Sequence, residues 1–213
     1  MQPFHDRREA GRALARHLHE FEDASDALVL ALPRGGVPVG DEIACALHLP
    51  LDVLIVRKVG APGQPELAVG AIASGGAVVW NEELTTLFPA AELQAIAAEE
   101  RDELIRRETL YRGNRGALQV KGKTVIVVDD GAATGATMRV ALQVLRSSGA
   151  RQIIVALPVA SDSAIELLRG EADRVHCMFV PPSFNAVGAW YRDFSPTTDE
   201  EVIRLLGRTH TSP

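Results

Sequence analysis

The stretch that decides the fold is VIVVDDGAATGATM, residues 125–138, in which an aliphatic run meets two adjacent carboxylates and then a series of small residues. The aliphatic run is typical of a strand buried in a parallel sheet. Asp129 and Asp130 therefore emerge at the carboxyl end of that strand, where open α/β sheets bind their ligands. Two carboxylates this close repel each other, so we expect a cation or hydrogen-bond donors such as sugar hydroxyls to balance them.

The small residues that follow leave room for a ligand to approach the backbone. They lead into a predicted helix that begins near Gly135, and the free amides and dipole of a helix N-terminus favour an anion. Carboxylates beside an anion site suit a ligand with vicinal hydroxyls at one end and a phosphate at the other, which describes a ribose phosphate. The predicted phosphate-binding residues are Gly131, Ala132, Ala133, Thr134, Gly135, Ala136 and Thr137.

Two other phosphate-binding motifs are excluded by their spacing. A Walker-type loop has a lysine after its last glycine, whereas Gly135 is followed by Ala136. The Rossmann fingerprint has three glycines at its own spacing and no acidic pair ahead of them. Neither motif fits this stretch.

Further aliphatic runs alternate with helical patterns along the chain, and this alternation implies a parallel, doubly wound α/β sheet. The segment VGAPGQPE, residues 59–66, has two glycines and two prolines and predicts a loop. The predicted strands are 27–33, 51–58, 67–72, 77–80, 151–160 and 174–180. The predicted helices are an N-terminal one with Ala10, Leu14, Leu18 and Phe21 on one face, then 41–49, 89–111, one from Gly135 with Met138, Leu142 and Leu145 facing inward, 162–170 and 200–206.

Length and composition exclude several classes of protein. The chain has 213 residues, which suits one domain, and 46% hydrophobic residues, which suits a buried core. A net charge of −6 with scattered arginines gives no basic face for nucleic acid, and the apolar runs are too short to cross a bilayer. The first residues lack the apolar core of a secretion signal. We therefore expect a cytoplasmic protein, with Cys45 and Cys177 as buried free thiols.

VIVVDDGAATGATM resembles the phosphoribosyl-pyrophosphate (PRPP) binding motif of type I phosphoribosyltransferases. In that family four hydrophobic residues precede an acidic pair that holds the ribose hydroxyls, and a small loop rich in Thr and Gly wraps the 5′-phosphate. Gly131 and Ala132 stand where bulkier aliphatic residues are more usual. The resemblance covers almost the whole chain, because the order of DRREAGR, LPRGG, VRKVGAPGQPELAVGAI and FNAVGAWYRDF is similar to that of a bacterial subgroup with no settled acceptor.

The resemblance implies roles for further residues. PRGG is similar to the family's pyrophosphate loop, which often contains a strained peptide, so Arg34, Gly35 and Gly36 are implied to bind pyrophosphate. VRKVGAPGQPE lies where the family has a mobile catalytic loop, which makes Arg57 and Lys58 candidate leaving-group contacts; solvated side chains at a strand end are the alternative. The implied catalytic residues are Asp129, Asp130, Lys58 and Arg34.

Family members have a small hood lobe that closes over the base, and residues 183–194 form the most aromatic stretch of this chain. The resemblance implies that one ring from this stretch stacks on the base, with packing inside the lobe as the alternative. Ser161 and Asp162 either line the acceptor pocket or cap a helix. The candidate base-binding residues are Phe184, Trp190, Asp193 and Phe194, with Tyr191 as a further ring. The expected organisation is one domain over 1–213, with a core of about 24–180, a hood of about 181–197 joined by the N-terminal segment, and a C-terminal helix of about 198–207.

The resemblance implies a Mg²⁺-dependent phosphoribosyltransferase that moves the 5-phosphoribosyl group of PRPP to a nitrogenous base or similar nucleophile and releases pyrophosphate. Mg²⁺ would be held mainly through PRPP, with Asp129 or Asp130 as the candidate protein ligand. A PRPP or nucleotide sensor of the same fold is the alternative. Hydrolysis of a phosphorylated ribose is disfavoured, because no Ser/His/Asp set or metal cluster has a useful spacing. Family members are usually dimers or larger, so a homo-oligomer is expected by analogy.

Overall fold

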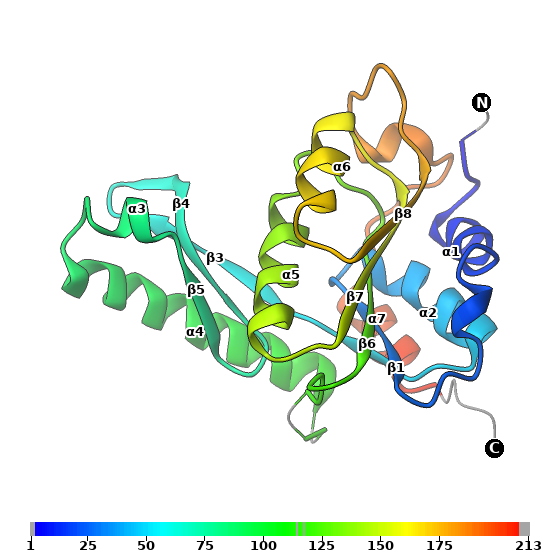
Figure 1. Ribbon diagram of the computed structural model, residues 1–213, viewed down its shortest axis with the longest axis horizontal. Helices are drawn as coiled ribbons and strands as arrows, with labels where there is room; N and C mark the ends of the chain where they lie inside the picture. The colour runs from blue at the N-terminus through cyan, green and yellow to red at the C-terminus, as the bar shows by residue number, and fades with distance from the viewer. Residues whose placement is uncertain (1–2, 114, 117, 209–213) are drawn as a thin grey trace.

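The protein is built around a five-stranded parallel sheet with the strand order β2-β1-β6-β7-β8 (Figure 1). The computed structural model describes residues 3–113, 115–116 and 118–208. The parallel sheet confirms the predicted α/β class. Its strands are Ala27–Ala31 (β1), Leu51–Val53 (β2), Thr124–Val128 (β6), Gln152–Val159 (β7) and Arg174–Phe179 (β8).

Helices cover both faces of this sheet because its central strand is apolar on both sides. Ile126 and Val128 of β6 pack into one core with α1, α2 and α7, whereas Val125 and Val127 pack into a second core with α5 and α6. The sheet is therefore doubly wound, as predicted. The helices are α1 (Arg7–Ala15), α2 (Gly36–Leu47), α5 (Ala136–Ser147), α6 (Asp162–Arg169) and α7 (Asp199–Leu206).

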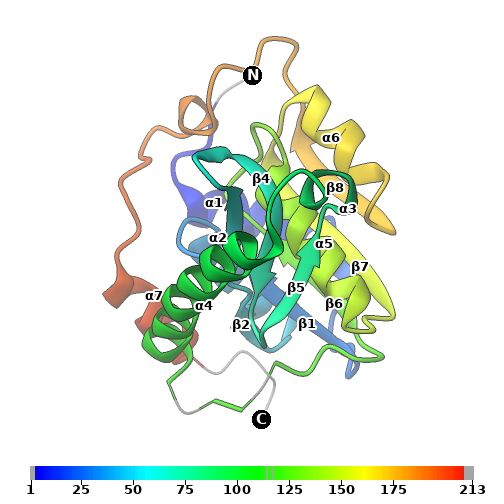
Figure 2. The same ribbon diagram turned by 90° about the vertical axis from the view of Figure 1, so that its left-hand side faces the viewer.

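A second, antiparallel sheet forms an arm beside the parallel one and was not predicted. Its order is β3-β4-β5, and α4 packs against one face while α5 lies near the other. The arm lies on the left of Figure 1 and faces the viewer in Figure 2. Its elements are β3 (Val56–Ala61), β4 (Gln64–Ala73), β5 (Ala77–Trp80), α3 (Glu82–Thr85) and α4 (Ala90–Arg112).

Two sequence-based predictions are wrong at the start of this arm. The predicted strand 51–58 is two strands in different sheets, joined through Leu54 and Ile55. Both joining residues are buried and aliphatic, like the strands on either side. The sequence pattern therefore does not show where one sheet ends and the other begins. The predicted loop 59–66 is the hairpin of β3 and β4, because Gly63 makes a tight turn with a φ of 70° that glycine accommodates without strain.

Smaller expectations differ at the N-terminus and at one thiol. The first helix ends at Ala15, and Leu18 and Phe21 reach the core from the 3-10 turn that follows it. Cys45 is exposed on α2 and Cys177 is half-buried, so the prediction of two buried thiols is wrong for Cys45. The other predicted helices are present, with α2 starting earlier than expected. The 3-10 helices are η1 (His19–Phe21) and η2 (Val187–Trp190).

The aromatic segment 181–197 returns from β8 along the N-terminus, and we call it the hood segment. The amide of Phe4 donates to the Trp190 carbonyl at 2.9 Å, and the amide of Asp193 donates to the His5 carbonyl at 2.8 Å. Both views place this segment beside the start of α1 (Figures 1 and 2). Among the described helices, none is long and apolar enough to cross a membrane.

Candidate active site

Two loops meet at the carboxyl ends of β1 and β6, which are neighbouring strands. Asp129 and Asp130 follow β6, and the loop PRGG, residues 33–36, follows β1. A Cβ atom on Gly35 would lie 2.0 Å from Asp130 Oδ2, and one on Gly36 would lie 2.7 Å from the Val128 carbonyl oxygen. Side chains at either position would collide with the acidic loop. The structure therefore brings the predicted pyrophosphate loop directly against the predicted ribose-binding acids.

Two residues remote in sequence hold Asp130. Arg7 Nε donates to Asp130 Oδ2 at 2.8 Å, and the Tyr191 hydroxyl donates to the Asp130 carbonyl oxygen at 2.6 Å. Sequence reasoning missed both contacts, because no local pattern links α1 or the hood segment to β6. The family-like order of DRREAGR and FNAVGAWYRDF, which contain the two residues, was the signal that pointed toward them.

The acidic pair carries more negative charge than its neighbours balance. Burial raises the pKa of Asp129 well above its ordinary value of 3.8, and the charge of Asp130 adds to the increase. Burial also raises the pKa of Asp130, although the hydrogen bond from Arg7 opposes the effect. A site with excess negative charge attracts a divalent cation or a ligand with hydroxyl donors. This is the electrostatic setting that the sequence predicted.

The bend between the acids and α5 is open to solvent. Ala133, Thr134 and Thr137 are exposed, so a ligand can reach the bend in front of the helix N-terminus. Gly135 has a φ of 72° and immediately precedes α5, whose first amides have no partner within the helix. Thr134 Oγ1 accepts a hydrogen bond from the amide of Ala136 at 3.3 Å. The bend therefore has the accessible backbone that an anion site requires.

Neighbouring elements fix the two sides of this bend. Ser161 Oγ donates to the Ala133 carbonyl at 2.6 Å and accepts from the Ala164 amide at 3.0 Å, so it braces the bend while capping α6. On the other side, a Cβ atom on Gly131 would lie 2.6 Å from Val187 of the hood segment. A bulkier residue at position 131 would displace Val187, which explains why this chain has glycine there.

Comparisons with known proteins agree with this geometry. A family model described as the phosphoribosyl transferase domain matches residues 4–187. The chain belongs to the phosphoribosyl transferase family. Two Mycobacterium tuberculosis proteins, from strains CDC 1551 and H37Rv and each named "Putative phosphoribosyl transferase", are 44% identical over 212 residues. The match covers 99% of this chain. It covers 48% of each relative, so this chain spans about half the length of those proteins.

A solved structure is also similar over nearly the whole chain. The crystal structure of TT1426 from Thermus thermophilus has 46% sequence identity and a TM-score of 0.88. The match covers 97% of this chain and 98% of that one. The fold of this phosphoribosyl transferase family member is therefore similar to one solved by crystallography.

Arg34, the predicted pyrophosphate ligand, is half-exposed and lies near the start of α7. Its Nη1 lies 3.5 Å from Asp199 Oδ1 at the start of α7. The Tyr111 hydroxyl donates to the same carboxylate oxygen at 2.5 Å, and burial together with this bond raises the pKa of Tyr111 to about 12. The peptide between Pro33 and Arg34 is cis.

Arg57 and Lys58 point to opposite faces of the arm, because successive strand residues alternate. Arg57 pairs with Glu100 of α4, with Nε 2.7 Å from the carboxylate. Lys58 stands opposite Ala71 of β4, which stands opposite Val79 of β5. Val79 packs toward the α5 core, so Lys58 lies on the side of the arm that faces α5. This placement favours Lys58 over Arg57 as a ligand contact.

A cleft of about 600 Å³ separates the arm from α5. Ala71 and Val79 line it from the arm, and Arg139 and Gln143 line it from α5. Ala136, at the end of the phosphate bend, also lines it, so the cleft opens beside the predicted phosphate site. Sequence reasoning did not predict this cleft, because the second sheet that forms one wall was read as strands of the main sheet and a loop.

Most of the candidate base-binding residues pack against other residues of the hood segment or against β8. The ring of Trp190 stacks on Phe179 at 6.2 Å between centroids, and that of Phe194 stacks on Tyr191 at 5.1 Å. Asp193 accepts hydrogen bonds from the amide and hydroxyl of Ser195. These contacts match the alternative of packing inside the lobe. Phe184 is half-buried and stacks on no other aromatic ring among the described residues.

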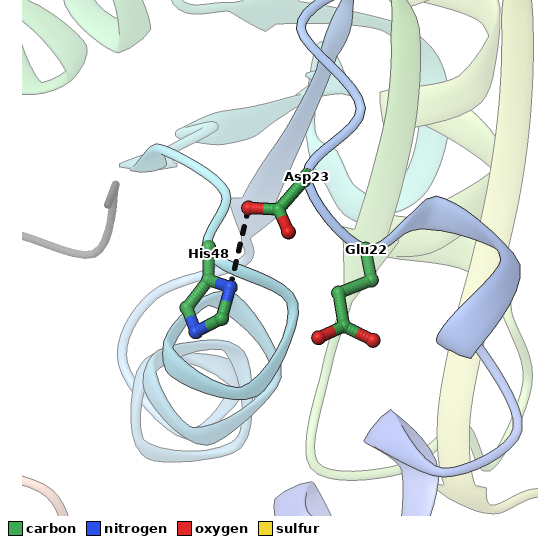
Figure 3. A group of neighbouring side chains, drawn as sticks. All are labelled: Glu22, Asp23 and His48. Carbon is green, nitrogen blue, oxygen red and sulfur yellow. Dashed lines mark ion pairs between the residues drawn. The ribbon is translucent and has the colours of Figure 1, made fainter. Parts of the chain in front are cut away.

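A cluster of possible metal ligands lies at the opposite end of α2. Glu22, Asp23 and His48 place one ligand atom each within 4.8 Å of one another, and His48 Nδ1 is 3.2 Å from Asp23 Oδ1 (Figure 3). All three side chains are exposed. Because α2 begins at Gly36 and His48 follows its last residue, about 18 Å of helix separate the cluster from the acidic pair. It therefore takes no part in the candidate active site.

Proposed function

We propose that this protein transfers the 5-phosphoribosyl group of PRPP to a nitrogen nucleophile, with Mg²⁺, in the cytoplasm. The contact between Gly35 and Asp130 supports the proposal most directly, because it brings the pyrophosphate loop and the acidic pair together. The open bend at Thr134–Thr137 adds a phosphate site on the same loop. PRPP has one group for each of these three features. Its 5′-phosphate matches the bend, its vicinal hydroxyls match the acidic pair, and its pyrophosphate matches the PRGG loop.

The proposed reaction forms a bond from the acceptor nitrogen to the anomeric carbon and breaks the bond from that carbon to pyrophosphate. The bonding electrons leave with pyrophosphate, and the ring passes through a cationic, oxocarbenium-like state. Asp129 and Asp130 would orient the ribose through its hydroxyls and favour the positive ring. Arg34 and the amides of Gly35 and Gly36 would stabilise the negative charge on the leaving group.

The residues of this site fit a magnesium ion. Mg²⁺ prefers oxygen ligands and is usually bound by one or two carboxylates together with substrate phosphates. Asp129 and Asp130 offer carboxylate oxygens whose charge is only partly balanced, which is the donor set that such an ion takes. When bound, the ion would supply positive charge to the pyrophosphate oxygens.

The hairpin of β3 and β4 would cover the reacting atoms. It carries Lys58 on the side of the arm that faces α5, and the cleft between them provides space for movement of the hairpin toward the bend. Closure would exclude water, which otherwise hydrolyses PRPP, and would bring a second positive charge to the leaving group.

An acceptor panel tests the proposed function. Purified protein is incubated with PRPP, Mg²⁺ and individual purine and pyrimidine bases, and pyrophosphate release is measured. We expect release with at least one class of base, and loss of release after Mg²⁺ is chelated. The Asp130→Asn variant is the inactive control. Tight PRPP binding without release for every base would instead support the sensor, and absence of PRPP binding would refute both functions.

A further inference from the structure

Arg7 is fixed against Asp130 by several further contacts. Its Nε donates to Asp130 Oδ2 at 2.8 Å, and its Nη1 donates to the Ser195 carbonyl at 2.8 Å. The guanidinium carbon lies 3.9 Å from the centre of the Phe194 ring, close enough for a cation–π contact. Only 11% of the Arg7 side chain is exposed. An arginine held this way is a rigid part of the site rather than a mobile surface charge.

The same contacts determine which oxygen of Asp130 is available to a ligand. Oδ2 accepts the hydrogen bond from Arg7, and it is also the Asp130 atom nearest to the position of a Cβ on Gly35, at 2.0 Å compared with 3.2 Å for Oδ1. A carboxylate has two oxygens, so the bond from Arg7 leaves Oδ1 for the ligand. Without the guanidinium, Oδ2 would lose the hydrogen bond that fixes the orientation of the carboxylate.

We infer that Arg7 is a positioning residue that gives the site its preference for ribose, by presenting Asp130 Oδ1 to the ribose hydroxyls. This inference rests on the proposed function, since it needs Asp130 to contact the sugar. It adds a residue of α1 to the site, which is otherwise formed by the PRGG loop and the stretch 125–138. Arg7 does not touch the ligand in this account. It acts through Asp130, and its contacts with Phe194 and Ser195 fasten the hood segment to the same carboxylate.

A comparison of three small ligands tests this role. Dissociation constants for ribose 5-phosphate, 2-deoxyribose 5-phosphate and inorganic phosphate are measured by calorimetry for the wild type, Arg7→Ala and Arg7→Lys. We expect Arg7→Ala to weaken ribose 5-phosphate binding about tenfold and to reduce the preference over the deoxy sugar to about twofold or less. Phosphate binding should change by less than about twofold, because the hydrogen bonds and ring contacts of Arg7 among the described residues go to Asp130, Ser195, Tyr191 and Phe194 and not to the bend. Arg7→Lys keeps the charge and should retain part of the preference.

Arg8→Ala is the matched control for this experiment. Arg8 is the next residue of α1 and pairs with Asp41 and Glu42 of α2, away from the acidic pair. The Arg8→Ala variant should keep the wild-type preference for ribose 5-phosphate over the deoxy sugar, even if its free energy of unfolding falls. Equal losses for all three ligands in Arg7→Ala would mean that Arg7 only supports the fold, and an unchanged preference would also overturn the inference. A wild type that binds ribose 5-phosphate no better than phosphate would refute the proposed function as well.

Discussion

Replacement of Gly35 by alanine is expected to reduce PRPP affinity about 100-fold, or by about 3 kcal/mol, in a protein that still folds. The new Cβ would lie 2.0 Å from Asp130 Oδ2, so the carboxylate must move away and lose its bond to Arg7. Gly35 has a φ of −59°, a conformation that alanine adopts readily, so the effect is steric and not a backbone effect. Calorimetry with PRPP and Mg²⁺ measures the loss.

The matched control is Gly116→Ala. A Cβ atom on Gly116 would meet no atom of the described residues within 4 Å, its chain neighbours aside, and its φ lies outside the left-handed region. Both variants make the same chemical change, so they alter the entropy of the unfolded chain equally. We expect the control to bind PRPP as the wild type does. If Gly35→Ala binds PRPP within about threefold of the control, the loop does not act on Asp130 as described.

Replacement of Asp129 by asparagine is expected to reduce ribose 5-phosphate affinity at least about 30-fold, or by about 2 kcal/mol, while making the free protein more stable. Asparagine has nearly the same shape, and its Oδ1 can still accept the bond from the Asp130 amide that Asp129 accepts at 2.8 Å. The change removes a buried charge and relieves repulsion with Asp130. We expect the free energy of unfolding at neutral pH to rise by roughly 0.5–2 kcal/mol, the usual gain when a stabilising substitution replaces a functional residue.

The stability gain should depend on pH in a defined direction. The pKa of Asp129 is higher in the folded protein than its ordinary value of 3.8, so its contribution to stability is fully present below that value and is lost as pH rises through the folded pKa. The advantage of Asp129→Asn should therefore grow from pH 4 toward pH 7. Urea unfolding of both proteins across this range measures it. A gain that is constant with pH, or a wild type that is more stable at pH 7, would contradict the electrostatics described above.

The positions of the acidic pair and of the open bend after it could be predicted because the relevant information is local. The aliphatic run of β6 fixes where Asp129 and Asp130 emerge, and the small residues after them determine the open bend. The approach of PRGG was predictable through the family resemblance and from the rule that ligands lie at the carboxyl ends of parallel strands. None of these features requires knowledge of a distant contact.

The sequence failed where a tertiary contact determines the outcome. Arg7 reaches Asp130 across 123 positions, and no periodic pattern reports such a pair. The change of sheet between Val53 and Val56 was hidden because buried linkers and buried strands have the same aliphatic composition. The hood rings were candidates for stacking on a base, yet Trp190 and Phe194 pack on their own neighbours, and composition does not distinguish these uses of an aromatic side chain.

The central claim is that the acidic pair and the bend after it bind opposite ends of one sugar phosphate. A crystal structure with ribose 5-phosphate and Mg²⁺ tests it most directly. We predict the phosphate at the amides of residues 134–137, the sugar hydroxyls within hydrogen-bond distance of Asp129 and Asp130, and the anomeric carbon facing Gly35. A phosphate bound elsewhere, or hydroxyls turned away from both carboxylates, would contradict the account.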